Sequence, residues 1–267
     1  MRELWKLQRH RPRSTSVAAP IRLAFAPTAV GAVILIAALS ACSPTTGPTS
    51  PPSTSSNPSS SVTGTPDAGD VRGRLAAGLR DSSPANASLV ENPKSSVTPV
   101  PATWLPGWQI LDVVNLTPPH PRRVHAALSD DGRALVLSGQ PDSFSTVLAE
   151  SGVSVDSAAV ATDVAEVFLD STHDFVTLSY RVDEVGDIRW RPKLSAEQER
   201  VRDQVISAYG DEVAPAGGTP ASGGWMVTAW TVTGTDLVRH QIGIGADGTI
   251  ADKTETVFSD LPVPASS

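Results

Sequence analysis

Cysteine is nearly absent from this chain, since Cys42 is the only one among 267 residues. A single thiol cannot form an internal disulfide, and it cannot supply the paired thiolates of a zinc-cysteine site. Aromatic residues are also few, at 5% of the chain. A folded domain in this sequence must therefore be held together by its hydrophobic core, without covalent or metal cross-links.

The local motifs that mark common catalytic and metal sites are absent as well. The sequence contains no G-x-S-x-G elbow, no H-E-x-x-H pair, no S-x-x-K set and no phosphate-binding loop. Asp183, Glu184 and Asp187 flank Gly186, but their spacing does not fit a calcium loop, so an acidic turn is expected. The sequence therefore assigns no catalytic residue, no metal ligand and no cofactor.

Positive charge is scarce beyond residue 41. Residues 1–41 hold six of the 21 Lys and Arg side chains and one of the 28 Asp and Glu side chains. The remaining chain thus has a formal net charge of −12, against −7 for the whole. Nucleic acids bind to basic surfaces, so this acidity argues against a nucleic-acid partner. It also argues against electrostatic docking on anionic lipid.

The N-terminal region has a distinct order of properties. Six basic residues lie within residues 1–22, an apolar run of eleven residues covers 29–39, and Leu39-Ser40-Ala41-Cys42 ends it. Eleven residues suit the apolar region of a secretory signal and fall short of the ~20 that a membrane span needs. This order resembles the lipobox of bacterial lipoprotein precursors.

The resemblance implies cleavage between Ala41 and Cys42 and a diacylglyceryl group on Cys42. Two or more acyl chains hold a protein stably to a membrane. The expected location is therefore the outer face of the cell membrane, with the lipid anchor on Cys42. Two alternatives are a secreted protein cleaved near Ser40 and an uncleaved signal anchor. Arginine outnumbers lysine 17 to 4, a bias similar to that of actinobacterial proteins.

Composition and periodicity divide the chain into five segments. These are a signal peptide over 1–41, the lipidated cysteine and a tether over 42–66, a transitional segment over 67–97, an α+β domain over 98–262 and a tail over 263–267. All residues of 43–66 except Val62 are Ser, Thr, Pro, Gly or Asn, which predicts a disordered tether. A short helix is possible over 70–80, although Gly73 and Gly78 weaken it.

Patterns of apolar residues predict both strands and helices in the domain. Strands are expected over 108–114, 123–128, 133–137, 176–182, 225–233, 237–244 and 249–258. For 176–182 a continuation of the preceding helix is the alternative. One helix is expected to run to about Asp170 from a cap at Ser154 or Asp156. A second helix is expected to follow the capping box of Ser195 and Gln198 and to end at Gly210.

The grouping of the strands into hairpins indicates the α+β class. We expect a curved antiparallel sheet, made of a hairpin and a C-terminal three-stranded meander, packed against two or three helices. This order loosely resembles the cystatin-like and nuclear-transport-factor-2-like rolls. The resemblance concerns the order of elements and implies no function.

Four residues are candidates for binding a ligand or partner. His240 shares a strand face with apolar residues, so we expect either a hydrogen-bonded core histidine or a ligand contact at the mouth of a pocket. Trp225 and Trp230 lie on opposite faces of one strand, so one of them packs on helices and the other is covered or forms a binding surface. Trp190 either plugs the core or belongs to a recognition loop.

These observations favour a non-enzymatic, lipid-anchored module that binds an envelope protein, a wall component or a small apolar ligand. One alternative is an envelope hydrolase whose site is assembled from dispersed carboxylates and from His120, His125, His173 or His240. Another alternative is a lipoprotein that regulates a membrane partner.

Overall fold

The computed structural model describes residues 68–119 and 121–264. The expected signal peptide, the Ala41–Cys42 cleavage site, the tether and His120 all lie outside these ranges. Within the ranges, no helix is both long enough and apolar enough to cross a membrane.

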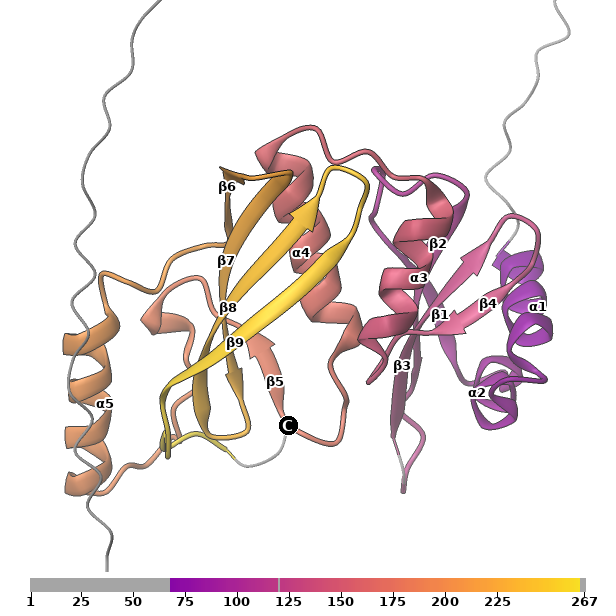
Figure 1. Ribbon diagram of the computed structural model, residues 1–267. Helices are drawn as coiled ribbons and strands as arrows, with labels where there is room; N and C mark the ends of the chain where they lie inside the picture. Colours follow the sequence, from indigo (N-terminus) through magenta and orange to yellow (C-terminus); the bar gives the residue numbers. More distant parts are fainter. Residues whose placement is uncertain (1–67, 120, 265–267) are drawn as a thin grey trace, which may run out of the picture. The chain divides into compact units, whose positions relative to one another are not determined.

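The first half of the described chain builds a four-stranded antiparallel sheet in the order β1-β2-β3-β4 (Figure 1). Its strands are β1 (Ser96–Val100), β2 (Trp108–Asn115), β3 (Arg122–Ser129) and β4 (Ala134–Val136). Helices α1 (Ala68–Leu79) and α2 (Pro84–Glu91) precede this sheet, and α3 (Pro141–Ser151) and α4 (Ala158–Thr172) follow it.

The second half builds a five-stranded antiparallel sheet in the order β5-β7-β8-β9, with β6 paired to β7. Its strands are β5 (Ser179–Arg181), β6 (Gly217–Ala221), β7 (Gly224–Thr233), β8 (Asp236–Gly245) and β9 (Ile250–Phe258). A short 3-10 turn, η1 (Val185–Asp187), and helix α5 (Ala196–Tyr209) lie between β5 and β6.

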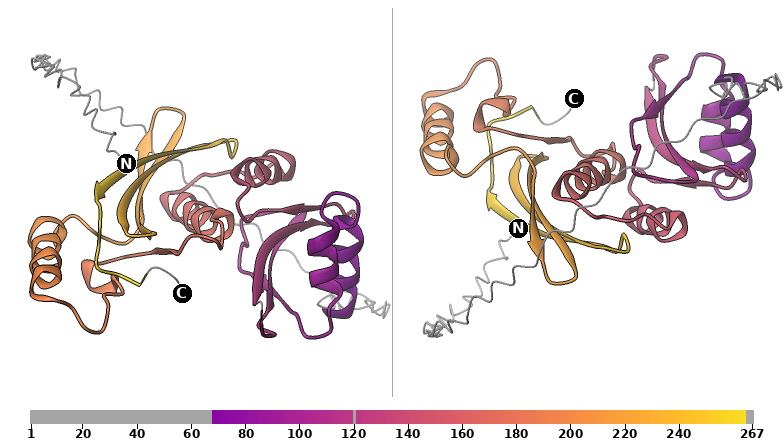
Figure 2. Two further views of the ribbon diagram at one scale, coloured as in Figure 1. Left: turned by 90° about the horizontal axis from the view of Figure 1, so that it is seen from below. Right: turned by 90° about the horizontal axis from the view of Figure 1, so that it is seen from above.

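Three groups of buried side chains hold these elements together. One joins α1 and α2 to one face of the first sheet, through residues such as Leu75 and Leu111. The central group joins the other face of that sheet to α3, α4 and the second sheet, with Phe144 and Phe168 among its members. The two helices are seen between the sheets in Figure 2. The third group covers the opposite face of the second sheet and includes Trp230.

The predicted α+β class is confirmed, with two antiparallel sheets and five α-helices in the described residues. The fold has more elements than expected, because α2 and α3 were not predicted. The strand expected over 176–182 is shorter than predicted and covers Ser179–Arg181. The folded part also begins earlier than residue 98. Val71, Leu75 and Leu79 of α1 are buried against the first sheet, which makes the transitional segment part of the core.

Local capping explains where the two longest predicted helices begin. Ser195 Oγ accepts a hydrogen bond from Gln198 N at 3.3 Å, and Gln198 Oε1 accepts one from Ser195 N at 3.0 Å, as the capping box predicts. Helix α4 is capped by Ser157, whose Oγ accepts from Val160 N at 3.3 Å. The cap is thus neither Ser154 nor Asp156, which are the residues that the sequence suggested.

Candidate functional site

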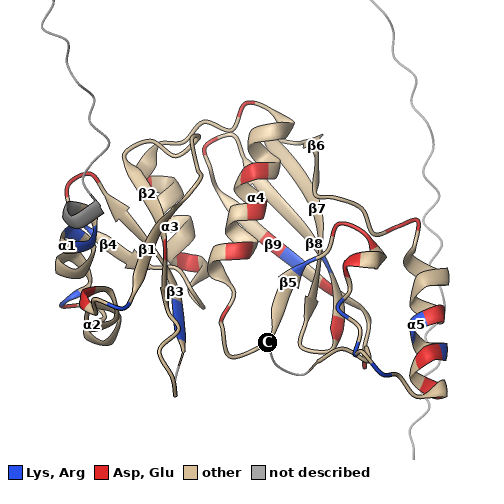
Figure 3. Ribbon diagram, turned by 180° about the vertical axis from the view of Figure 1, so that it is seen from behind, with Lys and Arg blue, Asp and Glu red and all other residues tan. Residues whose placement is uncertain are grey.

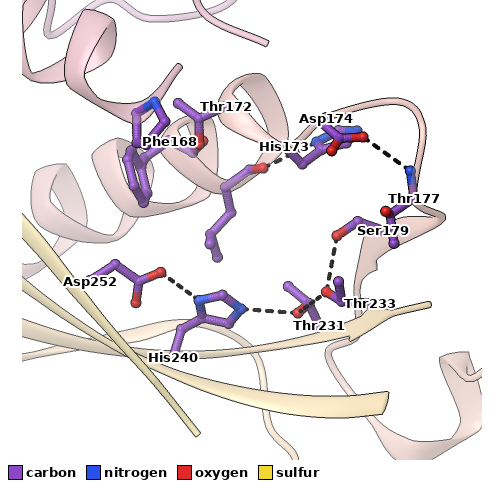
Figure 4. A pocket seen from close by; sticks show the side chains of 12 residues that line it. Phe168, Thr172, His173, Asp174, Thr177, Ser179, Thr231, Thr233, His240 and Asp252 are labelled. Carbon is purple, nitrogen blue, oxygen red and sulfur yellow. Dashed lines mark hydrogen bonds and ion pairs between the residues drawn. The ribbon is translucent and has the colours of Figure 1, made fainter. Parts of the chain in front are cut away.

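A row of hydrogen-bonded polar side chains crosses the second sheet. Asp252 of β9 lies 2.8 Å from Nδ1 of His240 on β8, and Nε2 of His240 lies 2.9 Å from Oγ1 of Thr231 on β7. The row continues from Thr231 to Thr233 at 3.2 Å and from Thr233 to Ser179 of β5 at 3.3 Å. Figure 4 shows these five side chains along one side of a pocket.

Strand register explains why these residues meet. His240 pairs with Ala229, Thr231 pairs with Val238, and Asp252 pairs with Ile242. Since side chains alternate between the faces of a sheet, these pairings put His240, Thr231 and Asp252 on the face that carries Ile242. That face packs on α4, so the centre of the polar row is buried: Thr231 is 3% exposed and His240 is 8% exposed. Ser179 and Thr233 are half-buried, and Asp252 is exposed.

The opposite wall of this pocket comes from the end of α4 and the segment after it. Phe168, Thr172 and His173 lie across from the row in Figure 4. Asp174 holds the following turn by accepting a hydrogen bond from Thr177 N at 3.0 Å. We call this cavity the threonine pocket; it has a volume of about 320 Å³, and its polar lining includes Thr172, Thr177, Ser179, Thr231, Thr233 and His240.

The distances within the row are consistent with the following arrangement of protons. In the neutral tautomer that donates Nδ1–H to the Asp252 carboxylate, Nε2 accepts the hydroxyl proton of Thr231. Thr231 Oγ1 keeps a lone pair for a hydrogen bond from Thr233. The order carboxylate, imidazole, hydroxyl is also the order in which nucleophilic enzymes activate a hydroxyl group.

A second cavity of about 600 Å³ adjoins the first, and His173, Thr177 and Ser179 line both. We call it the arginine pocket; its lining includes Arg123, Arg181, Arg189, His125, Phe175 and Tyr180. Two of its guanidinium groups are paired with carboxylates. Arg123 binds both oxygens of Asp112, at 2.8 and 2.9 Å. This hydrogen bonding raises the pKa of Arg123 above its ordinary value.

Arg181 of β5 faces the acidic side of α4. It lies 2.8 Å from Glu166 and 3.0 Å from Asp170, which are one helical turn apart. Figure 3 shows the acidic residues of α4 in red and the basic segment of β5 in blue.

Arg189 differs from the other two arginines of this pocket. Among residues 68–119 and 121–264 its guanidinium makes no ion pair, and its Cζ lies over the Tyr180 ring, 4.4 Å from the ring centre. Arg189 N donates to the Tyr180 hydroxyl at 2.9 Å, which fixes the backbone next to the ring. Burial raises the pKa of Tyr180, so the phenol is neutral.

His125 lies at the base of the arginine pocket and is 4% exposed. Burial lowers its pKa to about 4, and the nearby Asp112, with an oxygen 3.6 Å from Nε2, offsets that effect only in part. Nδ1 of His125 is buried and has no hydrogen-bond partner in the part of the chain that the structure describes. The ring packs at 5.7 Å from Phe175, and the His173 ring is 4.6 Å from the same phenylalanine.

The structure places the four predicted binding residues in different surroundings. His240 is hydrogen-bonded through both ring nitrogens and lines the threonine pocket, and its contact with a ligand stays a prediction. Trp225 packs on the central core and donates from Nε1 to Val155 O at 3.1 Å. Trp230 is buried in the third core, and Trp190 packs against the same group.

Several pocket residues were not singled out from the sequence. Thr231 and Asp252 lie on the same sheet face as His240. The alternation of side chains along the predicted meander could therefore have identified them. Arg189 directly precedes Trp190, and the sequence gives it no role of its own. Nothing in the sequence connects it to Tyr180, because the turn at Val185–Asp187 is what brings the two together.

Comparison with known proteins adds no relative to this picture. No protein-family model matches the chain, and no curated protein or solved structure matches it.

Proposed function

We propose that this chain is a lipid-anchored envelope protein whose folded part binds a small, hydroxyl-rich ligand in the threonine pocket. The observation that carries this proposal is the hydrogen-bonded row of Asp252, His240, Thr231, Thr233 and Ser179 along one wall of that pocket.

The chemistry of the row favours hydroxyl groups as partners. Each hydroxyl of Thr231, Thr233 and Ser179 can donate one hydrogen bond and accept others. A ligand hydroxyl has the same dual capacity, so it can join such a row in either direction. Thr172 and Thr177 on the other side of the pocket add two more hydroxyl groups, of which that of Thr172 is engaged with Phe168 O at 2.7 Å.

The pocket also has the size and rigidity expected of a ligand site. Its volume of about 320 Å³ is at the lower end of the roughly 300–1,000 Å³ that small-molecule pockets occupy. Thr231 and His240 are in paired central strands, so their side chains are held before a ligand arrives, and little ordering entropy is lost on binding. Phe168 and Pro141 supply the apolar part of the lining.

The placement of the protein rests on its N-terminal sequence. The basic segment, the eleven-residue apolar run and the small residues before Cys42 support cleavage and lipidation there. Mass spectrometry of the mature protein tests this directly. We expect an N-terminal Cys42 with at least two acyl chains, whereas an unmodified Cys42 or a retained signal peptide would contradict the proposed anchor.

Ligand binding is tested with the full chain in detergent and a panel of monosaccharides and polyols, read by saturation-transfer NMR. Thr231→Val removes the central hydroxyl at nearly constant volume and should abolish binding of any panel member that the wild type retains. Thr228→Val is the matched control, because Thr228 lies on the same strand, is exposed and points to the other face. Equal binding by both variants would contradict the proposal.

A second candidate function is hydrolysis of an ester. The specific observation that favours it is the Asp252–His240–Thr231 order at 2.8 and 2.9 Å. In that reaction Thr231 Oγ1 attacks the ester carbonyl carbon while His240 Nε2 takes the hydroxyl proton. His240 then gives this proton to the departing alcohol. Water releases the acyl group from Thr231 in the second half of the reaction.

Intact-protein mass spectrometry separates this function from binding alone. Incubation with p-nitrophenyl acetate should add one acetyl group at Thr231 and release p-nitrophenol, and Thr231→Val should do neither. A wild-type protein that binds panel sugars but neither gains acetyl mass nor releases p-nitrophenol is a binding module, and the hydrolase alternative then fails.

A further inference from the structure

We infer that the ligand also carries a carboxylate, which Arg189 binds in the adjoining arginine pocket, so that the ligand is an acidic saccharide lying across both cavities. This inference rests on the proposed binding of hydroxyl groups in the threonine pocket, and it adds a second, charged recognition element to it.

The two cavities are adjacent and share part of their lining. His173, Thr177 and Ser179 contribute to the lining of both, and Ser179 is the last member of the hydrogen-bonded row. Tyr180 is the next residue of β5 and belongs to the arginine pocket, where it supports Arg189. Tyr180 points to the opposite face of the sheet from Ser179, and β5 is an edge strand, so a ligand that leaves the row at Ser179 passes over the edge of β5 to reach Arg189.

The charges of the arginine pocket leave one guanidinium for a ligand. Asp112 is engaged by Arg123, and Asp170 and Glu166 are both engaged by Arg181. Each of these carboxylates is therefore compensated. Arg189 has no carboxylate partner in the described ranges, and its fork of N–H groups matches the two oxygens of a carboxylate.

The surroundings of Arg189 favour a ring with apolar faces over a small inorganic anion such as phosphate. The contact with the Tyr180 ring restrains the guanidinium, which reduces the rotamer freedom lost when an anion binds. Phe175 and Val176 also line the pocket, and they are 38% and 95% exposed. Exposed apolar side chains beside hydroxyl and guanidinium groups suit a ligand that has both apolar C–H faces and polar edges, which is the character of a pyranose ring with a carboxylate.

The acidic groups of the threonine pocket are compatible with this ligand. Asp252 is bound by His240, and Asp174 accepts from the backbone N–H of Val176 and Thr177. Both carboxylates are oriented by these bonds, and each can accept a further hydrogen bond from a sugar hydroxyl. We place the carboxylate of the ligand in the arginine pocket, beside Arg189.

The test compares methyl β-glucuronide with its uncharged amide, methyl β-glucuronamide, by isothermal titration calorimetry on the full chain in detergent. The two probes have the same ring and hydroxyl groups, and they differ in the charge of one substituent. We expect the acid to bind at least about tenfold more tightly than the amide, as a charge-assisted, bidentate pair implies. This preference should fall to about one in Arg189→Gln and should be partly kept in Arg189→Lys.

Arg200→Gln is the matched control, since Arg200 is an exposed arginine of α5 whose removal changes the net charge equally. It should keep the full preference for the acid. Thr231→Val should weaken the acid and the amide by the same factor. Equal affinity of the wild type for the two probes overturns the carboxylate site and leaves the hydroxyl site standing. Failure of both probes to bind overturns both proposals.

Discussion

Replacing His125 by phenylalanine should change how the stability of this protein depends on pH. In the native state burial lowers the pKa of His125 to about 4, against an ordinary value of 6.5. The charged groups nearest to the ring come from three elements: Asp112 on β2, Arg123 on β3, and Asp170 with His173 at the end of α4. Phenylalanine keeps an aromatic ring beside Phe175 and cannot be protonated.

The sign of the effect follows from the direction of this shift. As pH falls below about 6.5, His125 takes up a proton in the unfolded chain first, because its folded pKa is lower. Protonation therefore favours unfolding, and native stability is lost progressively until about pH 4, where the folded state is protonated as well. A pKa difference of this size corresponds to about 3 kcal/mol between about pH 7 and about pH 4. His125→Phe should not suffer this loss.

Urea unfolding followed by tryptophan fluorescence at several pH values measures the effect. Carboxylates also titrate in this range, so the informative quantity is the stability of the variant minus that of the wild type. This difference should grow by about 3 kcal/mol from about pH 7 to about pH 4. Val113→Ala, in the buried strand β2, is a control that should give a constant offset. A constant offset for His125→Phe as well would refute the assigned burial effect.

Three further predictions concern the framework that holds the pockets, and thermal or urea unfolding measures each. A Cβ at Gly73 would meet nothing within 4 Å, whereas one at Gly78 would lie 2.5 Å from Gly132 O. Gly73→Ala should therefore stabilise α1 by up to about 1 kcal/mol. Gly78→Ala should destabilise the folded protein by about 1–3 kcal/mol. Equal effects of the two substitutions would contradict this close approach. Phe144→Ala should cost about 3–5 kcal/mol, because Phe144 is fully buried in the central core; a loss below 1 kcal/mol would show that this site is not packed as described. Ser195→Ala should cost about 1 kcal/mol through loss of the cap of α5, and full retention of stability would show that the capping box is dispensable.

The sequence predicted those elements whose residues carry a strong local signal. The C-terminal meander has long alternating strands joined by short turns, and helix α5 has a complete capping box. Strands β1 and β6 carry little such signal. Strand β1 contains Pro99, which is tolerated at the edge of a sheet, and β6 has the sequence GGTPA and forms only by pairing with β7.

The helices show the same division. Helix α3 begins with Pro141 and buries Phe144, Val147 and Leu148 at helical spacing, so its pattern was present but short. Helix α2 has eight residues and depends on packing against α1 and the first sheet. Short helices draw most of their stability from tertiary contacts, which a local pattern does not contain.

The candidate site was predictable only within one sheet. Alternation put His240 on an inward face, and the meander register adds Thr231 and Asp252 to that face. The opposite wall depends on how the end of α4 packs on the sheet, which no sequence pattern specified. The contact of Arg189 with Tyr180 depends on the turn at Val185–Asp187, where the sequence predicted an acidic turn but not its capping box of Glu184 and Asp187.

The pockets are lined partly by paired strands and partly by a connecting loop, and this difference suggests which residues set the specificity for the ligand. His240 and Thr231 belong to paired strands, so their positions cannot shift without loss of the ladder that holds the sheet. Residues 173–178 connect α4 to β5, form neither helix nor strand, and present Phe175 and Val176 to solvent. Binding residues on a loop beside a rigid scaffold can change while the fold is retained. The hydroxyl row should therefore determine that a hydroxylated ligand binds, and the 173–178 segment, together with Arg189, should determine which one.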